Sequence, residues 1–162
     1  MNIRKTLPTD LDAVMEIYAA AREFMKNSGN PDQWGENYPP RDMIECDIAQ
    51  GDAYVAEEDG EIVACFFYKT AVDPTYVKIY DGEWIDDREY SVIHRIAVKY
   101  NGRGIIGRIF DHCAGISNSI RIDTHRDNKP MQRSLEKNGF TRCGIIYLED
   151  GDERVAFQKV CR

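Results

Sequence analysis

The sequence predicts an α+β protein, in which a mixed β-sheet carries helices on both faces, formed as a single domain over residues 1–162. Short runs of β-branched and aromatic residues alternate with amphipathic helical patterns, which indicates that strands and helices are interleaved along the chain. Two turn sequences, Glu58-Asp59-Gly60 and Glu149-Asp150-Gly151-Asp152, each predict a β-hairpin. A length of 162 residues suffices for one hydrophobic core.

A long amphipathic helix is the clearest element near the N-terminus. Pro8-Thr9-Asp10 is typical of a helix start and Asn27-Ser28-Gly29 of a helix end. Between them, apolar residues recur at helical spacing, at Leu11, Val14, Met15, Tyr18, Ala21 and Met25. A strand is expected before this helix at 2–6, and after it a shorter helix at 42–50 and strands at 53–57 and 62–68.

Two stretches without regular periodicity carry large aromatic rings. Residues 30–40 are a loop by their Pro, Gly and Asn content, yet they contain Trp34 and Tyr38. Residues 70–89 are strongly acidic, contain Trp84, and include a partial strand at 77–80. These rings either cover the edge of the core or line a substrate site, and the acidic charges either form a solvated face or attract a cationic amine.

The second half of the chain predicts the remaining elements. Ser91–Val98 is an apolar, β-branched strand that passes through a glycine-rich turn into a helix ending near Gly115. Asn128 is typical of an N-cap, with Pro130 in the first helical turn. Further strands are expected at 118–123, 140–148 and 154–159, and the helix that begins at Asn128 ends at Asn138-Gly139.

The turn between strand and helix, residues 99–107, has the chemistry of a phosphate site. Backbone N–H groups at a helix start have no intrahelical partner and lie at the positive end of the helix dipole. Glycines allow a sharp turn and keep Cβ atoms away from a ligand. Arg103 and Arg108 would add charge-assisted contacts. The alternative is an ordinary glycine-bearing connection.

One rival reading of this turn is a dinucleotide fingerprint. Gly102-x-Gly104-x-x-Gly107 matches G-x-G-x-x-G, with Asp123 as a ribose partner. However, Lys99-Tyr100-Asn101 separates the strand from the first glycine, the chain after Asp123 is too short for a doubly wound sheet, and the long N-terminal part is unexplained. We therefore set aside a nucleotide-binding oxidoreductase.

Two motifs resemble the GNAT superfamily of acetyl-CoA-dependent N-acetyltransferases. Ile96-Ala97-Val98 followed by Asn101-Gly102-Arg103-Gly104-Ile105-Ile106 resembles its motif A, Q/R-x-x-G-x-G/A after a strand. Here Asn101 replaces Gln or Arg, Ile106 replaces a small residue, and Gly107 offers room one position later. Asn128-x-Pro130-Met131-x-x-x-Leu135-Glu136-Lys137-Asn138-Gly139-Phe140 resembles motif B, N-x-x-A-x-x-x-Y-x-x-x-G-F.

The resemblance implies a GNAT-like, largely antiparallel central sheet and acetyl-CoA as cosubstrate. It implies that the coenzyme contacts backbone and side chains of Ile96, Ala97, Val98, Asn101, Gly102, Arg103, Gly104, Ile105, Ile106, Gly107, Arg108 and Asn128. A backbone N–H along residues 96–98 would stabilise the oxyanion, so side-chain identity there carries no information.

An amine must lose a proton before it attacks a thioester, so the site requires a base. His94 is the candidate, since His94-Arg95-Ile96-Ala97-Val98 matches the H-x-x-A-V of arylalkylamine N-acetyltransferases. The alternatives are a packed structural histidine at this position and proton acceptance by Glu83 through water.

The chain differs from the family at the acid that protonates the thiolate leaving group. Motif B places a tyrosine at the position of Leu135, which has no hydroxyl group. Tyr147, Cys143 or solvent is the substitute, and the sequence does not select among them. A thiolate is a good leaving group, so loss of the acid should weaken transfer without abolishing it.

Composition excludes several other classes of protein. A net charge of −7 argues against a nucleic-acid partner. No apolar run is long enough to cross a bilayer and no signal-like segment opens the sequence, so a cytoplasmic protein without membrane partner is expected. Five scattered cysteines argue against a disulfide framework and a zinc site, and no metal is expected.

The function predicted from these observations is acetyl transfer from acetyl-CoA to the primary amine of a small molecule by direct attack. Candidate catalytic residues are His94, Glu83 and Tyr147, and candidate substrate contacts are Trp34, Tyr38 and Trp84. A homodimer is the candidate assembly. The main rival is a catalytically degenerate GNAT domain that binds acyl-CoA as a sensor or partner module, for which Asn101, Ile106 and Leu135 argue.

Overall fold

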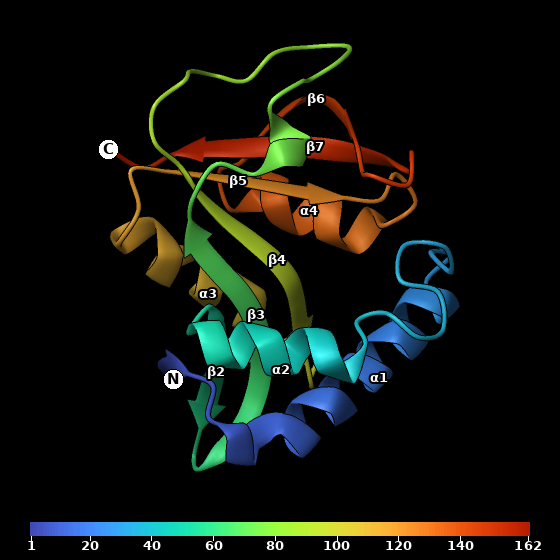
Figure 1. Cartoon of the computed structure of the whole chain (residues 1–162), viewed down its shortest axis with the longest axis vertical. Coiled ribbons are helices and arrows are strands. Elements are labelled where there is room, and N and C mark those ends of the chain that lie inside the picture. Colours follow the sequence, from blue (N-terminus) through green and yellow to red (C-terminus); the bar gives the residue numbers. More distant parts are fainter. The chain divides into compact units, whose positions relative to one another are not determined.

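The computed structural model describes all residues, 1–162, and contains seven strands and four α-helices (Figure 1). In chain order they are β1 (Asn2–Lys5), α1 (Leu11–Asn27), α2 (Arg41–Gln50), β2 (Ala53–Glu58), β3 (Glu61–Thr70), β4 (Ser91–Val98), α3 (Ile105–Gly115), β5 (Ser119–Thr124), α4 (Lys129–Lys137), β6 (Thr141–Tyr147) and β7 (Glu153–Val160). The boundaries expected from the sequence lie within two residues of these.

The strands form one mostly antiparallel sheet in the order β1-β2-β3-β4-β5-β7-β6. The pairs β1–β2, β2–β3, β5–β7 and β6–β7 are antiparallel. The strands β4 and β5 pair in parallel, with Ser91 opposite Ile120 and Val92 opposite Arg121. This mixed α/β architecture confirms the predicted fold class and does not match the doubly wound sheet of a dinucleotide-binding domain.

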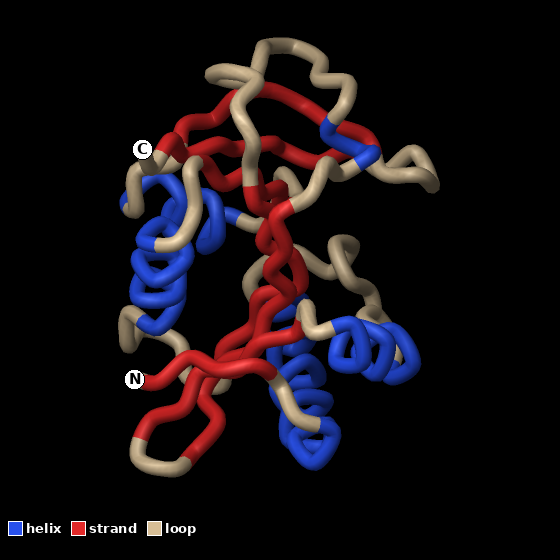
Figure 2. The backbone as a smooth tube through the Cα atoms, turned by 60° about the vertical axis from the view of Figure 1, so that its left-hand side comes forward, coloured by secondary structure: helices blue, strands red, loops and turns tan.

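The chain divides into two compact units, each of which takes two segments of the sequence. The first consists of Met1–Tyr68 and His94–Ile109, and the second of Lys69–Ile93 and Phe110–Arg162. Figure 2 shows α1 and α2 of the first unit on the same side of the strands β2 and β3. The prediction of a single domain stays a prediction. No helix is both long enough and apolar enough to cross a membrane.

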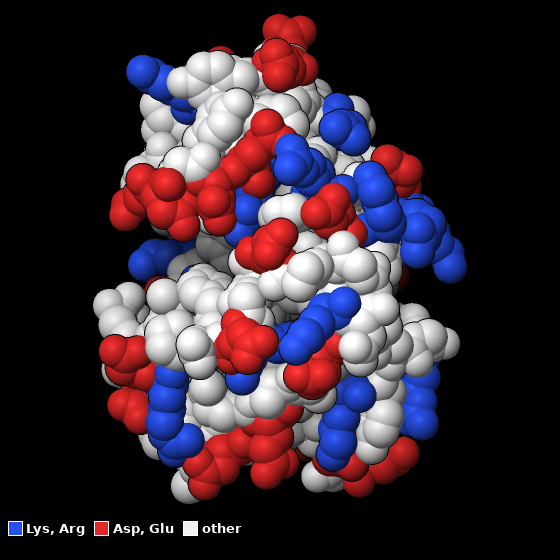
Figure 3. Space-filling view, turned by 90° about the vertical axis from the view of Figure 1, so that its right-hand side faces the viewer, with Lys and Arg blue, Asp and Glu red and all other residues white.

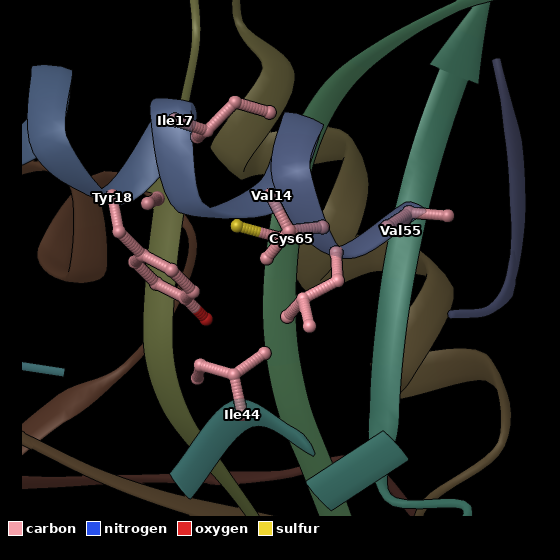
Figure 4. Close-up of a cluster of buried hydrophobic side chains, with 8 residues drawn as sticks. Val14, Ile17, Tyr18, Ile44, Val55 and Cys65 are labelled. Carbon is pink, nitrogen blue, oxygen red and sulfur yellow. The ribbon is translucent and has the colours of Figure 1, made fainter. Parts of the chain in front are cut away.

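The core of the first unit lies between α1, α2 and the strands (Figure 4). Val14 and Tyr18 of the apolar stripe predicted for α1, and Ile17 beside them, share a buried cluster with Cys65 of β3 and Val55 of β2. Trp34 packs against this cluster, and its ring meets that of Tyr18 edge-on at 5.7 Å between centroids. The cluster therefore extends into the loop between the two helices.

The acidic segment of the second unit is ordered, although its sequence has no periodicity. The partial strand expected at 77–80 does not form: a 3₁₀ turn occupies Pro74–Tyr76, and Tyr80 alone makes an antiparallel bridge, to Ile145 of β6. The physical reason is that this stretch pairs with the edge strand β6 at one residue only. The Tyr80 N–H donates to the Ile145 carbonyl at 2.8 Å, and the Ile145 N–H donates to the Tyr80 carbonyl at 2.7 Å.

Two buried polar side chains of the sheet fix the rest of this segment. Gln158 of β7 accepts a hydrogen bond from the Ile85 N–H and donates to Ser119, both at 2.9 Å. The Arg121 guanidinium of β5 lies between the rings of Trp84 and Tyr90, 4.1 Å from each centroid. Hydrogen bonds and cation–π contacts thus replace the missing periodicity in ordering residues 77–90.

Candidate active site

The strand β4 changes its alternation at Arg95. Arg95 has a φ of 50°, a left-handed conformation that a residue with a Cβ rarely adopts. Successive side chains of a regular strand point to opposite faces. Here His94 and Arg95 both contact the ring of Phe67, with centroids 5.7 Å apart for His94 and the guanidinium carbon 4.7 Å from the centroid for Arg95. The irregularity therefore presents two consecutive polar side chains together, as a β-bulge does.

Contacts from three other segments hold Arg95 in this conformation. Its Nη2 donates to Asp47 Oδ2 of α2 at 2.7 Å, and this ion pair is nearly buried, with side-chain exposures of 13% and 12%. Its Nη1 lies 3.4 Å from the hydroxyl of Tyr38 in the α1–α2 loop. Its carbonyl accepts a hydrogen bond of 2.8 Å from the Tyr18 hydroxyl. Several contacts of this kind are what a strained backbone conformation needs in order to persist.

Burial sets the titration of the groups around Arg95. Burial raises the pKa of the Asp47 carboxyl, while the Arg95 charge pulls it in the opposite direction. Burial also raises the pKa of Tyr18 well above its usual range and that of the neighbouring Cys65 thiol to about 12. Tyr18 and Cys65 therefore stay protonated at neutral pH and act as hydrogen-bonding and packing groups.

The residues predicted to stabilise the oxyanion follow directly on β4. Ile96 and Ala97 are buried, Val98 is half-buried, and Ala97 belongs to the core cluster under α1 and α2. The Lys99 N–H donates to the Val63 carbonyl at 2.8 Å. The side chains here fill the core, which leaves only the backbone groups for chemistry.

The glycine turn after β4 has the backbone that a phosphate site requires. Gly102 and Gly104 have φ values of 78° and 69° and are exposed, and a Cβ added at either would meet no atom within 4 Å. The Arg108 N–H donates to the Gly104 carbonyl at 3.2 Å, so Gly104 begins the hydrogen bonding of α3. The N–H groups of Ile105, Ile106 and Gly107 precede that bond and point out of the helix start, where phosphate oxygens fit.

Two basic side chains that were expected near the phosphates differ in their surroundings. Arg108 forms an ion pair with Glu58 of β2. Arg103 lies over the ring of Tyr100, 4.1 Å from its centroid. The Tyr100 hydroxyl in turn donates to Glu61 at 3.2 Å, an oxygen that Lys99 also contacts at 3.2 Å. The turn is therefore tied to the hairpin of β2 and β3 through its side chains.

Motif B in the second unit combines a structural cap with a buried position. Asn128 is buried and its side chain accepts a hydrogen bond of 3.2 Å from the Met131 N–H, the N-cap role that the sequence left as an alternative. Leu135, at the position of the family's tyrosine, is completely buried. A side chain at that position belongs to the core, and the Leu135 carbonyl accepts a hydrogen bond of 3.0 Å from the Phe140 N–H.

The other candidates of the second unit have individual environments. Glu83 is exposed, and Tyr147 is exposed with its ring edge-on to Tyr80 at 5.3 Å between centroids. Cys143 is buried, which raises its pKa, and its thiol lies 3.3 Å from the Thr141 carbonyl. The Trp84 indole N–H donates to the Tyr76 carbonyl at 2.9 Å, so this ring helps to order its own segment.

Four parts of the predicted site belong to the first unit: His94, the turn at 101–108, Trp34 and Tyr38. Sequence reasoning missed Arg95, which follows His94, and its partners Asp47, Tyr18 and Phe67. The one signal for Arg95 was a charged residue inside an otherwise apolar strand. Nothing in the sequence connects it with Asp47, which lies 48 positions earlier.

Comparison with solved structures assigns the class. An acetyltransferase of the GNAT family from Streptococcus agalactiae 2603 superposes with a TM-score of 0.90 at 32% identity, over 98% of this chain and 94% of that one. A putative acetyltransferase from Staphylococcus aureus Mu50 gives a TM-score of 0.72 at 25% identity over the whole of both chains. A ribosomal-protein-alanine N-acetyltransferase from Brucella melitensis shares the fold, with a TM-score of 0.63 at 20% identity over 99% of both chains.

The fold and the similarity to these structures thus define an acyltransferase of the acetyl-transferring type. The chain belongs to the GNAT family of acetyltransferases. Members of this family use acetyl-CoA as the acetyl donor. No protein-family model and no curated protein matches the sequence.

Proposed function

We propose that this protein is an N-acetyltransferase that moves the acetyl group of acetyl-CoA to a primary amine of a small molecule by direct attack. The observation that carries the proposal is the turn from β4 into α3. Two exposed glycines in left-handed conformations leave open space at the start of a helix, immediately after the strand that bears His94. A pyrophosphate fits that backbone through its N–H groups and through the positive end of the helix dipole.

The residues of this chain would divide the work as follows. The turn at 101–108 and Asn128 would bind the coenzyme, which supplies the thioester as acyl donor. A backbone N–H along residues 96–98 would stabilise the developing oxyanion. His94 would accept the proton of the attacking amine, with Glu83 acting through water as the alternative. Trp34, Tyr38 and Trp84 remain the proposed substrate contacts.

The proton for the thiolate would come from Tyr147 or from solvent. Leu135 has no hydroxyl group, and the Cys143 thiol is buried with a raised pKa. Tyr147 is exposed and keeps its phenol at the surface. Because a thiolate leaves readily, transfer does not depend on a strong acid at this position.

The test is coenzyme A release from acetyl-CoA with a panel of small primary amines, with product detected by mass. Acetylation of at least one amine at a rate well above hydrolysis is expected. A thiol reagent would also react with the exposed Cys46, so the assay needs an enzyme-only control. Titration with acetyl-CoA and with NAD in parallel should show binding of the former alone.

The second candidate is an acyl-CoA-binding module without turnover. The observation that favours it is Leu135, a completely buried side chain without a hydroxyl group at the position of the family's acid. Binding of acetyl-CoA without acetylation of any amine, peptide amines included, would support this candidate and exclude the enzyme.

A further inference from the structure

The guanidinium of Arg95 is held in place while some of its N–H donors remain unused. An arginine side chain offers five N–H donors and no acceptor. Asp47 accepts one of them, through Oδ2 alone, and the Tyr38 hydroxyl lies at 3.4 Å, at the long limit for a hydrogen bond. Nε is completely buried and has no partner. A buried donor left without an acceptor is destabilising, so its persistence calls for an explanation.

The backbone at the same residue is also strained. Arg95 adopts a left-handed φ of 50° inside a strand, and Tyr18 from α1 holds its carbonyl at 2.8 Å. Strain and unused donors are independent observations, since one concerns the main chain and the other the side chain. Both describe a residue that its surroundings hold in an unfavourable state, a feature that is frequent at functional sites.

The position of Arg95 next to His94 indicates that its ligand would be part of the acceptor substrate. It follows His94 directly, and both side chains contact the ring of Phe67. A group that binds the Nη atoms would therefore sit beside the proposed base. The guanidinium fork matches a carboxylate in shape and charge, and the aromatic face of Phe67 supports it from one side.

We propose that Arg95 recognises a carboxylate of the acceptor, so that the substrate is an amine that also carries a carboxylate, of the amino-acid class. The inference rests on the proposed function, because it assigns a substrate class to that same site. Asp47 then serves to orient Arg95. To recognise a cationic amine that has no carboxylate, the protein would need an acidic side chain whose charge is not already neutralised. The charge of Asp47 is neutralised by Arg95 at 2.7 Å.

Pairs of acceptors that differ only in the carboxylate provide the test: phenylalanine against phenethylamine, and lysine against cadaverine. For the wild-type protein with saturating acetyl-CoA, we expect kcat/KM to be at least about tenfold higher for the amino acid of a pair. Arg95→Lys keeps a charge for Asp47 but loses the fork. We expect it to reduce the preference to less than about threefold, mainly through a higher KM for the amino acid.

Arg41→Lys is the matched control, because Arg41 is an exposed arginine of α2 that pairs with Asp12 at 2.7 Å. It should keep the wild-type preference, and melting temperatures should show that both variants are folded. Equal turnover of the members of each pair, or faster turnover of the decarboxylated amines, would overturn the inference and leave the proposed function standing. If no amine at all is acetylated, the proposed function fails and this inference fails with it.

Discussion

His94 and its neighbours show how much of the candidate chemistry depends on single residues. His94 is half-buried against Phe67 and shares that ring with a charged residue. A histidine that only filled space could sit there equally well. Activity and stability must therefore be measured on the same variant.

For His94→Ala we expect kcat/KM to fall at least about 100-fold with coenzyme A affinity almost unchanged, because loss of a general base slows the chemical step. The rising limb of the pH profile should disappear with the imidazole. His112→Ala, an exposed histidine of α3, is the control and should retain activity. A folded His94→Ala protein with near-native turnover would contradict this role and assign the base to Glu83 or a water relay. A lower melting temperature, with activity that follows the folded fraction, would show that the role of the histidine is structural.

Leu135 gives a second prediction at the level of one side chain. The Leu135 side chain is completely buried. A tyrosine at this position would find no room for its ring and no water for its hydroxyl group. Leu135→Tyr should lower the free energy of unfolding by about 1–3 kcal/mol through overpacking and should not raise kcat. Denaturant unfolding and steady-state rates measure both. A gain in turnover would mean that the position reaches the reacting atoms after all.

The segment formed by β4, the glycine turn and α3 is the element on which the proposed coenzyme binding depends. A phosphate site here requires a left-handed backbone conformation and open space around it. Gly104 meets both conditions. A side chain here meets no protein atom, so its effect on a ligand is separable from packing.

Gly104→Val should raise the dissociation constant of coenzyme A at least tenfold, about 1.4 kcal/mol, because its methyl groups enter the space of the phosphates. Gly151→Val is the matched control, since Gly151 has a φ of 88° in the β6–β7 turn and the same open surroundings. Both changes should lower the melting temperature through backbone strain. Equal coenzyme affinity in the two variants, measured by calorimetry, would refute the phosphate site.

At the scale of the whole molecule, charge influences stability through a few partly buried contacts. On the face shown in Figure 3 acidic and basic side chains are interspersed. Arg4 of β1 contacts both Asp10 oxygens, at 2.7 and 3.2 Å, and pairs with Glu57 of β2. The Leu7 N–H also donates to Asp10, at 2.7 Å. This cluster joins the first strand, the start of α1 and the second strand.

The hydrogen bond from Arg4 lowers the pKa of Asp10. A carboxyl whose pKa is lower in the folded than in the unfolded state stabilises the fold above the unfolded pKa, and this contribution is lost as pH falls through the folded value. Asp10→Asn should therefore cost about 1.5–3 kcal/mol in unfolding free energy at pH 7, and the difference from wild type should shrink below about pH 4. Urea unfolding across this range measures it, and a pH-independent difference would contradict the assignment.

The sequence by itself determined the fold class, the glycine turn and the helices and strands, apart from the partial strand at 77–80 that does not form. These depend on local patterns: the apolar period of α1, the Asp-Gly turns, and glycines between a strand and a helix. A residue's neighbours along the chain are enough to specify them, because a helical or strand period and a turn conformation are settled within a few residues.

Only the tertiary structure decided which polar groups surround Arg95, next to His94, and how the acidic segment is ordered. Asp47 accepts a hydrogen bond from Arg95, which lies 48 positions away in the sequence, and Gln158 accepts one from Ile85, which lies 73 positions away. Such contacts leave no periodic trace, because they form where distant segments pack and where burial, not sequence spacing, brings a donor to an acceptor. For the same reason the left-handed backbone of Arg95 and the burial of Leu135 became visible only once the chain was folded.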